Sequence, residues 1–92
     1  MKTIYKYPIK AADRFALSMP QGARVLTVQN QREVPCLWAL VDPSEPERLY
    51  EFALVGTGHK REDLDGMSYL GTVQLRGGDL IFHLFGPTEK EL

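Results

Sequence analysis

Turn-forming residues interrupt this chain at short intervals, and this constrains its fold more than any other feature. Six prolines and eight glycines are spread over 92 residues, and they divide the chain into segments of about 8–12 residues, which is typical of all-β domains. Signals that start or stop helices are scarce by comparison. The spacing therefore predicts short β-strands joined by turns, with little or no helix.

Alternation of apolar and polar residues supports this interpretation, because successive side chains of a strand point to opposite faces. In the segment Thr3–Ile9, Tyr5, Tyr7 and Ile9 share one face, and a lysine-rich face lies opposite. Pro8 cannot donate a ladder hydrogen bond, so this segment is predicted to be an edge strand. We predict seven strands, at Thr3–Ile9, Phe15–Met19, Ala23–Gln29, Val34–Val41, Tyr50–Leu54, Met67–Leu75 and Leu80–Phe85.

Two of these segments are apolar on both faces. Val34–Val41 has no charged residue, and Leu80–Phe85 is interrupted only by His83. A strand of this kind is covered on both sides. The sequence therefore predicts a two-layer β-sandwich or flattened barrel, and it favours a homo-oligomer. We expect one domain over residues 1–87 and a flexible tail over residues 88–92.

Residues 44–54 allow two interpretations. Ser44 and Glu47 have the spacing of a helix capping box, but Tyr50, Phe52 and Leu54 alternate as they would in a strand. We favour a strand, because Gly56 ends the pattern too early for a useful helix. Farther along the chain, Arg76-Gly77-Gly78-Asp79 predicts a hairpin with a two-residue turn, since glycines tolerate the positive φ of that turn.

Charge and cysteine content exclude several classes of protein. Eleven basic and twelve acidic residues give a net charge of −1, whereas proteins that bind the phosphate backbone of nucleic acids usually carry a basic excess. No segment approaches the roughly 20 apolar residues of a membrane-spanning helix. A single cysteine, Cys36, allows no internal disulfide, which favours an intracellular, cytoplasmic location. We therefore expect neither nucleic acid nor a membrane as partner.

The sequence Gly56-Thr57-Gly58-His59 is the best candidate for a ligand site. Glycines let the backbone approach a ligand closely, and consecutive amides can form an anion-binding nest. Thr57 adds a hydroxyl group, and His59, Lys60 and Arg61 add basic groups. This composition suits a phosphate or nucleotide-like ligand, although the lysine of a P-loop is missing. The alternative is a glycine-rich strand end followed by a solvated loop.

His83 lies among apolar strand residues. It is either a hydrogen-bonded core histidine or a polar group in a ligand cavity. His59 and His83 together could serve as a general acid–base pair on a phosphoester or acyl substrate, if the fold brings them together. No nucleophile motif accompanies them, and Cys36 in its apolar run is expected to be buried and inert. We therefore expect binding rather than catalysis.

The chain contains no recognisable cofactor or metal motif. Two histidines and one cysteine lack the spacing of zinc ligands, and the acidic segment at residues 62–66 is too short for a calcium loop. We expect no metal and no cofactor. Aromatic side chains offer a different kind of site, because tyrosine and tryptophan are favoured at protein contacts. Tyr5, Tyr7 and Trp38 are our candidates for partner-binding residues, with core packing as the alternative.

Four segments of the chain resemble a family of short, uncharacterised proteins of tailed phages and prophages. These are Met-Lys-Thr-Ile-Tyr-Lys-Tyr-Pro at residues 1–8, Val34–Asp42, Gly56–His59 and Phe82–Phe85. The resemblance implies a setting rather than a mechanism. Small phage accessory proteins frequently counter host defence, either by inhibiting an immune protein or by sequestering a nucleotide signal. A host immune protein or a nucleotide-like molecule is therefore the expected partner, and a small enzyme or a virion component is the alternative.

Overall fold

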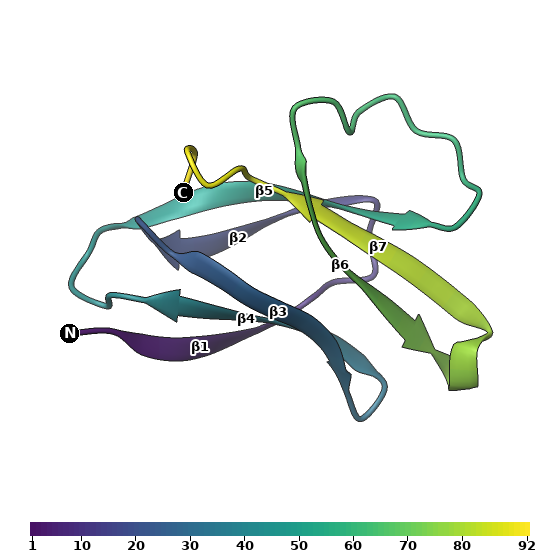
Figure 1. Ribbon diagram of the computed structural model, residues 1–92, viewed down its shortest axis with the longest axis horizontal. Coiled ribbons are helices and arrows are strands. Elements are labelled where there is room, and N and C mark those ends of the chain that lie inside the picture. Colours follow the sequence, from purple (N-terminus) through teal and green to yellow (C-terminus); the bar gives the residue numbers. More distant parts are fainter.

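The computed structural model describes residues 1–92 and contains seven β-strands (Figure 1). One short 3₁₀ turn, η1, covers Arg76–Gly78, and no α-helix is present. The strands are β1 (Thr3–Pro8), β2 (Arg14–Pro20), β3 (Arg24–Gln31), β4 (Val34–Val41), β5 (Glu47–Gly56), β6 (Ser68–Leu75) and β7 (Leu80–Gly86). The all-β prediction is confirmed, and the ambiguous segment at residues 44–54 contributes to strand β5.

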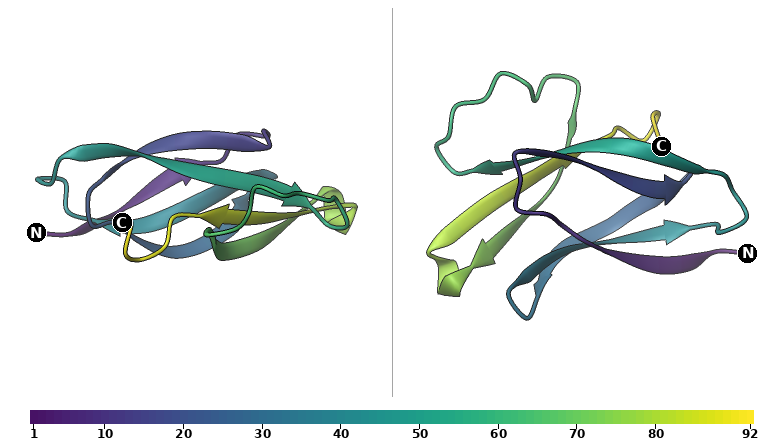
Figure 2. Two further views of the ribbon diagram at one scale, coloured as in Figure 1. Left: turned by 90° about the horizontal axis from the view of Figure 1, so that it is seen from above. Right: turned by 180° about the vertical axis from the view of Figure 1, so that it is seen from behind.

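The strands form two antiparallel sheets that lie face to face (Figure 2). The first sheet has the order β1-β4-β3, and the second has the order β2-β5-β7-β6. The molecule measures 40 × 30 × 16 Å, and its shortest dimension is consistent with two stacked layers. The predicted two-layer β-sandwich is therefore observed, and the sheets do not close into a barrel. No helix in the structure has the length and hydrophobicity needed to cross a membrane.

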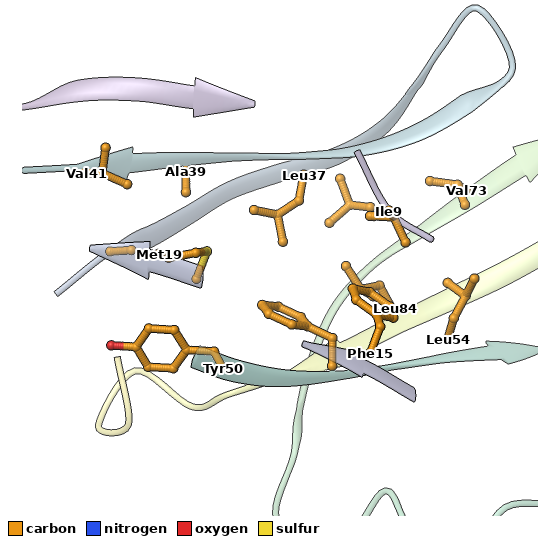
Figure 3. Close-up of a cluster of buried hydrophobic side chains, with 13 residues drawn as sticks. Ile9, Phe15, Met19, Leu37, Ala39, Val41, Tyr50, Leu54, Val73 and Leu84 are labelled. Carbon is orange, nitrogen blue, oxygen red and sulfur yellow. The ribbon is translucent and has the colours of Figure 1, made fainter. Parts of the chain in front are cut away.

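The hydrophobic core lies between the sheets and contains thirteen buried residues (Figure 3). Alternation places every second side chain of each strand in this space. Phe52 on β5 is fully buried, and its ring stacks on that of Phe15, its cross-strand partner, with centroids 5.5 Å apart. The other side chains in the cluster are Ile9, Met19, Ala23, Val28, Leu37, Ala39, Val41, Tyr50, Leu54, Val73 and Leu84.

The two sheets contact each other along β3 and β6, which are the terminal strands in the two sheet orders. A Cβ atom on Gly71 would lie 2.8 Å from the Cβ of Val28, so only glycine permits this distance between the strands. The Asn30 side-chain amide on β3 also donates a hydrogen bond to the carbonyl oxygen of Gln74 on β6. Each strand also has a bulge here, between Val25 and Thr27 on β3 and between Tyr69 and Gly71 on β6. Bulges of this kind increase the local twist of a strand.

Two sequence predictions need correction. The loop between β6 and β7 contains four residues rather than two, because Leu75 and Leu80 are the last paired residues. Arg76, Gly77 and Gly78 all adopt positive φ there. In addition, β4 is covered by the core on only one face, where Leu37, Ala39 and Val41 point. On its other face, which is the outer face of the sandwich, Trp38 and Leu40 are half-buried. Cys36 is also on this side but is buried, as expected from the sequence.

Residues 88–92 fold back on the domain. The carbonyl oxygen of Leu92 accepts hydrogen bonds from the Gly22 amide (2.6 Å) and from the Tyr50 hydroxyl (3.4 Å). The Leu92 side chain packs against the core. The flexibility that we expected for this tail stays a prediction, and these contacts are the ones that would have to break when it moves.

The Tyr7 hydroxyl group is buried and has no hydrogen-bond partner. Burial raises the pKa of Tyr7, with further contributions from Glu47 and Tyr5. Because an unsatisfied buried hydroxyl is destabilising, Tyr7→Phe is expected to raise the free energy of unfolding by about 1 kcal/mol. For a domain of this size that corresponds to a rise in Tm of about 4–8 °C. Calorimetry checks this, with Tyr5→Phe as the control; a lower Tm for Tyr7→Phe would contradict it.

Candidate functional site

The segment Gly56–His59 forms a tight turn at the end of β5. The His59 amide donates to the carbonyl oxygen of Gly56 at 3.1 Å, and Gly58 occupies the positive-φ position at +84°. The Thr57 amide donates to the carbonyl oxygen of Ile81 at 3.2 Å. An anion nest needs successive free amides, and here every second amide is already bonded within the protein. The expected nest is therefore absent from the turn.

His83 belongs to a network of four hydrogen-bonded side chains on the second sheet, formed by Thr57, His83, Thr72 and Tyr69. Its Nε2 atom lies 2.7 Å from Thr57 Oγ1, and its Nδ1 atom lies 2.9 Å from Thr72 Oγ1. Thr72 in turn lies 2.5 Å from the Tyr69 hydroxyl. Both ring nitrogens are thus satisfied by hydroxyl groups, which can rotate to donate or accept. Sequence reasoning placed Thr57 and His83 in one site, and the structure brings these two together.

The two histidines lie on opposite faces of the second sheet. Gly56 pairs with Phe82 across the ladder, whereas Val55 pairs with His83; alternation directs these two pairs to opposite faces. The His59 ring occupies the space beside Gly56, where a Cβ atom would come within 2.9 Å of it. His59 is therefore on the Phe82 side and His83 on the other. The structure does not support an acid–base pair made of the two.

Two small hollows, of about 270 and 360 Å³, flank His59. Both are lined by Gly56, His59 and Phe82, and neither is lined by His83. Asp79 lines the first hollow and Asp13 lines the second. An aspartate in each lining disfavours an anionic ligand, and neither hollow is lined by a lysine or an arginine.

Arg61 is not free to bind a ligand, contrary to expectation. Its Nε and Nη2 atoms both contact the carboxylate of Asp63 at 2.8 Å. Its guanidinium also donates to the carbonyl oxygens of Leu54 (3.0 Å) and Asp13 (3.1 Å). Arg14 reaches Asp63 as well, at 3.3 Å. Arg61 thus fastens the projecting loop of residues 57–67 to β5 and to the β1–β2 connection (Figure 1).

The ion pairs of Asp63 with Arg61 and Arg14 should make the free energy of unfolding depend on pH in the acid range. The hydrogen bonds from Arg61 are the main cause that lowers the pKa of Asp63 far below its usual range. A lowered folded-state pKa means that the stabilisation is present above the unfolded value of about 4 and is lost as pH falls. Between about pH 5 and pH 2, the wild-type chain is expected to lose more unfolding free energy than Asp63→Asn.

Urea unfolding at several pH values measures this difference. The pKa values of Asp42 and Glu91 are also lowered, by hydrogen bonds from Ser44 and Thr88 respectively. Those two groups titrate alike in both chains, so their contribution cancels in the comparison. Parallel pH curves for wild type and Asp63→Asn would show that the ion pair does not stabilise the fold.

The largest hollow, of about 660 Å³, was not anticipated from the sequence. It lies between the first residues of β3 and of β6, and Leu92 of the tail also lines it. Arg24, Val25, Tyr69 and Leu70 contribute to its wall. It depends on contacts between residues far apart in the chain, for which a single sequence carries no local signal.

The three candidate partner-binding residues divide between two surfaces. Tyr5 and Tyr7 pair with Ala39 and Leu37, so their side chains point toward the core side, where they meet edge to face at 6.3 Å. Trp38 pairs with Lys6 and Thr27, and these three form a row across the outer face of the first sheet. The structure therefore separates Trp38 from the two tyrosines.

Trp38 lies at the centre of an outer face on which apolar and polar side chains are mixed, with Lys6 and Thr27 beside it. Ile4 and Leu40 form the adjacent cross-strand row, and Val34 lies farther along β4. Ile4 is 55% exposed and Val34 is 46% exposed, while Trp38 and Leu40 are half-buried. We name this surface, made of Ile4, Val34, Trp38 and Leu40, the Trp38 face. No second layer of the chain covers it.

The structure contains no cluster of metal-ligating side chains near these surfaces. No group of three or more His, Cys, Asp or Glu side chains is arranged to hold a metal ion.

No curated protein and no solved structure shows significant similarity to the chain. One family model does match, over residues 1–92, and its description is "Domain of unknown function (DUF7352)". Because the match covers the whole sequence, the chain belongs to the DUF7352 family.

Proposed function

We propose that this chain is a small phage accessory protein that counters host antiviral defence by binding a host protein, without catalysis. The resemblance of four segments to proteins of tailed phages supports the setting. The Trp38 face supports the mode of action, and it is the observation that carries the proposal. The host cytoplasm is the location in which such a protein would act.

The Trp38 face has the properties of a protein contact surface. It combines exposed Ile4 and Val34 with half-buried Trp38 and Leu40 on the outer face of the first sheet. Exposed apolar side chains that are rimmed by polar residues, here Lys6, Thr27 and Gln31, mark interaction sites on soluble proteins. Tryptophan is among the residues that contribute most to binding energy when a partner covers them. A host protein bound here would cover apolar area that the sandwich itself leaves in water.

The alternatives receive less support from the geometry. Sequestration of a nucleotide signal would need free amides and cations near Gly56–His59, but Arg61 is paired with Asp63 there. Catalysis would need a substrate cavity lined by both Thr57 and His83, but Thr57 lines the hollow of about 270 Å³ and His83 lines none of the five hollows. A virion component remains the alternative of a different class.

Phage plating tests the proposal. The chain is produced in a bacterial strain that carries an active defence system and in a matched strain that lacks it, and a sensitive phage is plated on both. We expect production of the chain to restore plating only on the defended strain. If plating is unchanged across a panel of defence systems, or if the chain instead sediments with purified phage particles, the proposal is wrong.

A further inference from the structure

We propose that the free edge of β1 pairs with an extended, acidic strand of the partner protein, in a way that continues the first sheet. The inference rests on the proposed function, because it names the part of the partner that the chain recognises. β1 is the terminal strand in the order β1-β4-β3. Addition of a strand to such an edge is a recurrent mode of peptide recognition.

The backbone groups that β1 offers follow from its pairing with β4. The Ile9 amide donates to the carbonyl oxygen of Pro35 at 2.9 Å, so Ile9, Tyr7 and Tyr5 direct their backbone groups toward β4 at alternate positions. The residues between them, Ile4 and Lys6, direct theirs to the free edge. The backbone groups of Ile4 and Lys6 also make none of the backbone hydrogen bonds that lie outside the strand pairings. Pro8, which has no amide proton, ends the available edge.

The side chains at the same two positions define the partner's chemistry. Ile4 and Lys6 lie on the Trp38 face, in rows with Leu40 and Trp38. Lys6 forms no ion pair; its side chain reaches across β4 and donates a hydrogen bond to the side-chain oxygen of Gln31 on β3 at 2.7 Å. A partner strand at the free edge would have to exchange this neutral hydrogen bond for one to its own carboxylate. Opposite charges on facing positions of adjacent strands stabilise their pairing. A carboxylate opposite Lys6 and an apolar side chain opposite Ile4 would therefore satisfy this edge and extend the Trp38 face.

A second copy of the chain does not supply that chemistry. Residues 1–12 contain three lysines and no acidic residue. If two β1 edges pair antiparallel, each register places Lys6 opposite Ile4, another lysine or Pro8. None of these arrangements gives an opposite charge, and the register that pairs two Lys6 residues is repulsive. The edge is therefore suited to an acidic strand from a different protein.

Antiparallel pairing also fixes the order of the partner residues. The residue opposite Lys6 comes first, and the residue opposite Ile4 follows two positions later. The expected partner segment has the pattern Glu-x-Val, within a stretch that favours extended structure. The acetylated and amidated peptide Thr-Thr-Glu-Thr-Val-Thr-Thr is a suitable probe, and the same peptide with lysine in place of glutamate is its matched control.

NMR titration of the full chain with these two peptides tests the inference. We expect the Glu peptide to shift the amide signals of Ile4 and Lys6 and to slow their hydrogen exchange. The Lys peptide should bind about fivefold to tenfold more weakly, as expected when a favourable cross-strand charge pair becomes repulsive. The difference should shrink at high salt because exposed charges are screened.

Two variants make the result specific. Lys6→Glu should reverse the preference, so that the Lys peptide binds better than the Glu peptide; a reversal cannot arise from unfolding. Ile4→Pro removes one outward amide without touching the ladder to β4, and it should abolish binding while the chain stays folded.

Failure of the inference is distinguishable from failure of the proposed function. Equal binding of both peptides, shifts away from β1, or no reversal in Lys6→Glu would overturn the inference, even if the chain restores phage plating. Conversely, if the Glu peptide binds as described but the chain restores plating on no defended strain, the edge specificity stands and the proposed function fails.

Discussion

Replacing Phe52 by alanine is expected to lower the free energy of unfolding by about 3–5 kcal/mol, the usual cost of removing a buried phenylalanine ring. Phe52 is fully buried and is the largest such side chain in the domain. Its ring stacks on Phe15 and lies between the two sheets, so the surrounding strands cannot collapse into the space without breaking ladder contacts. Small domains have only about 5–15 kcal/mol of total stability, and the variant should be only marginally folded.

Leu49→Ala is the matched control for Phe52→Ala. Leu49 lies on the same strand three residues away, but its side chain is 76% exposed. The change there should stay within about 0.5 kcal/mol of wild type. Urea unfolding followed by circular dichroism measures both variants. If both lose the same small amount of free energy, then Phe52 does not occupy the centre of the core.

The second large effect is expected at Gly86. A Cβ atom at this position would come within 2.7 Å of both Phe52 and Leu70, and real Cβ atoms are essentially never found so close to other atoms. Because the clash lies inside the core, Gly86→Ala should cost about 1–3 kcal/mol. Backbone conformation plays no part, since Gly86 is not among the positive-φ glycines.

A double-mutant cycle separates this clash from other causes. In the Phe52→Ala background the ring is gone, and the methyl group of Gly86→Ala would enter the space it leaves. The close contact that remains is with Cδ1 of Leu70, the end of a flexible side chain, so the same substitution should cost less free energy in this background than in the wild type. Additive losses would contradict the packing, because contacting residues show coupling energies of about 0.5–3 kcal/mol.

The fold could be predicted largely from the sequence because its signals are local. Alternation located all seven strands, and the apolar segments at Val34–Val41 and Leu80–Phe85 indicated two layers. The exact loop at Arg76–Asp79 was missed, because both a two-residue and a four-residue turn place Gly77 and Gly78 at positive φ. The two-residue and four-residue turns differ in which residues of β6 and β7 form the last pair, and the composition of the turn does not reveal this.

The candidate site was predicted less well because its geometry depends on distant contacts. The contact between Thr57 and His83 joins residues 26 positions apart, and Arg61 bonds to a backbone oxygen 48 positions away at Asp13. Basic composition alone suggested that Arg61 was available to an anion. His59 and His83 lie on opposite faces of the second sheet. His59 follows the end of β5 at Gly56, so the alternation within the strand could not predict the face on which its side chain lies.

The most direct test of this account compares two surfaces in the phage-plating assay on a defended strain. One variant, Trp38→Ala, removes the centre of the Trp38 face. The other, His83→Ala, breaks the hydrogen-bonded chain with Thr57 and Thr72. Both chains are first checked for folding by circular dichroism and for equal amounts in cells. Truncation of a central interface tryptophan commonly costs 2 kcal/mol or more, which weakens binding by about 30-fold.

We therefore predict that Trp38→Ala loses the ability to restore plating and that His83→Ala retains it. The opposite result, with Trp38→Ala active and His83→Ala inactive, would contradict the account and would move the functional site to the second sheet.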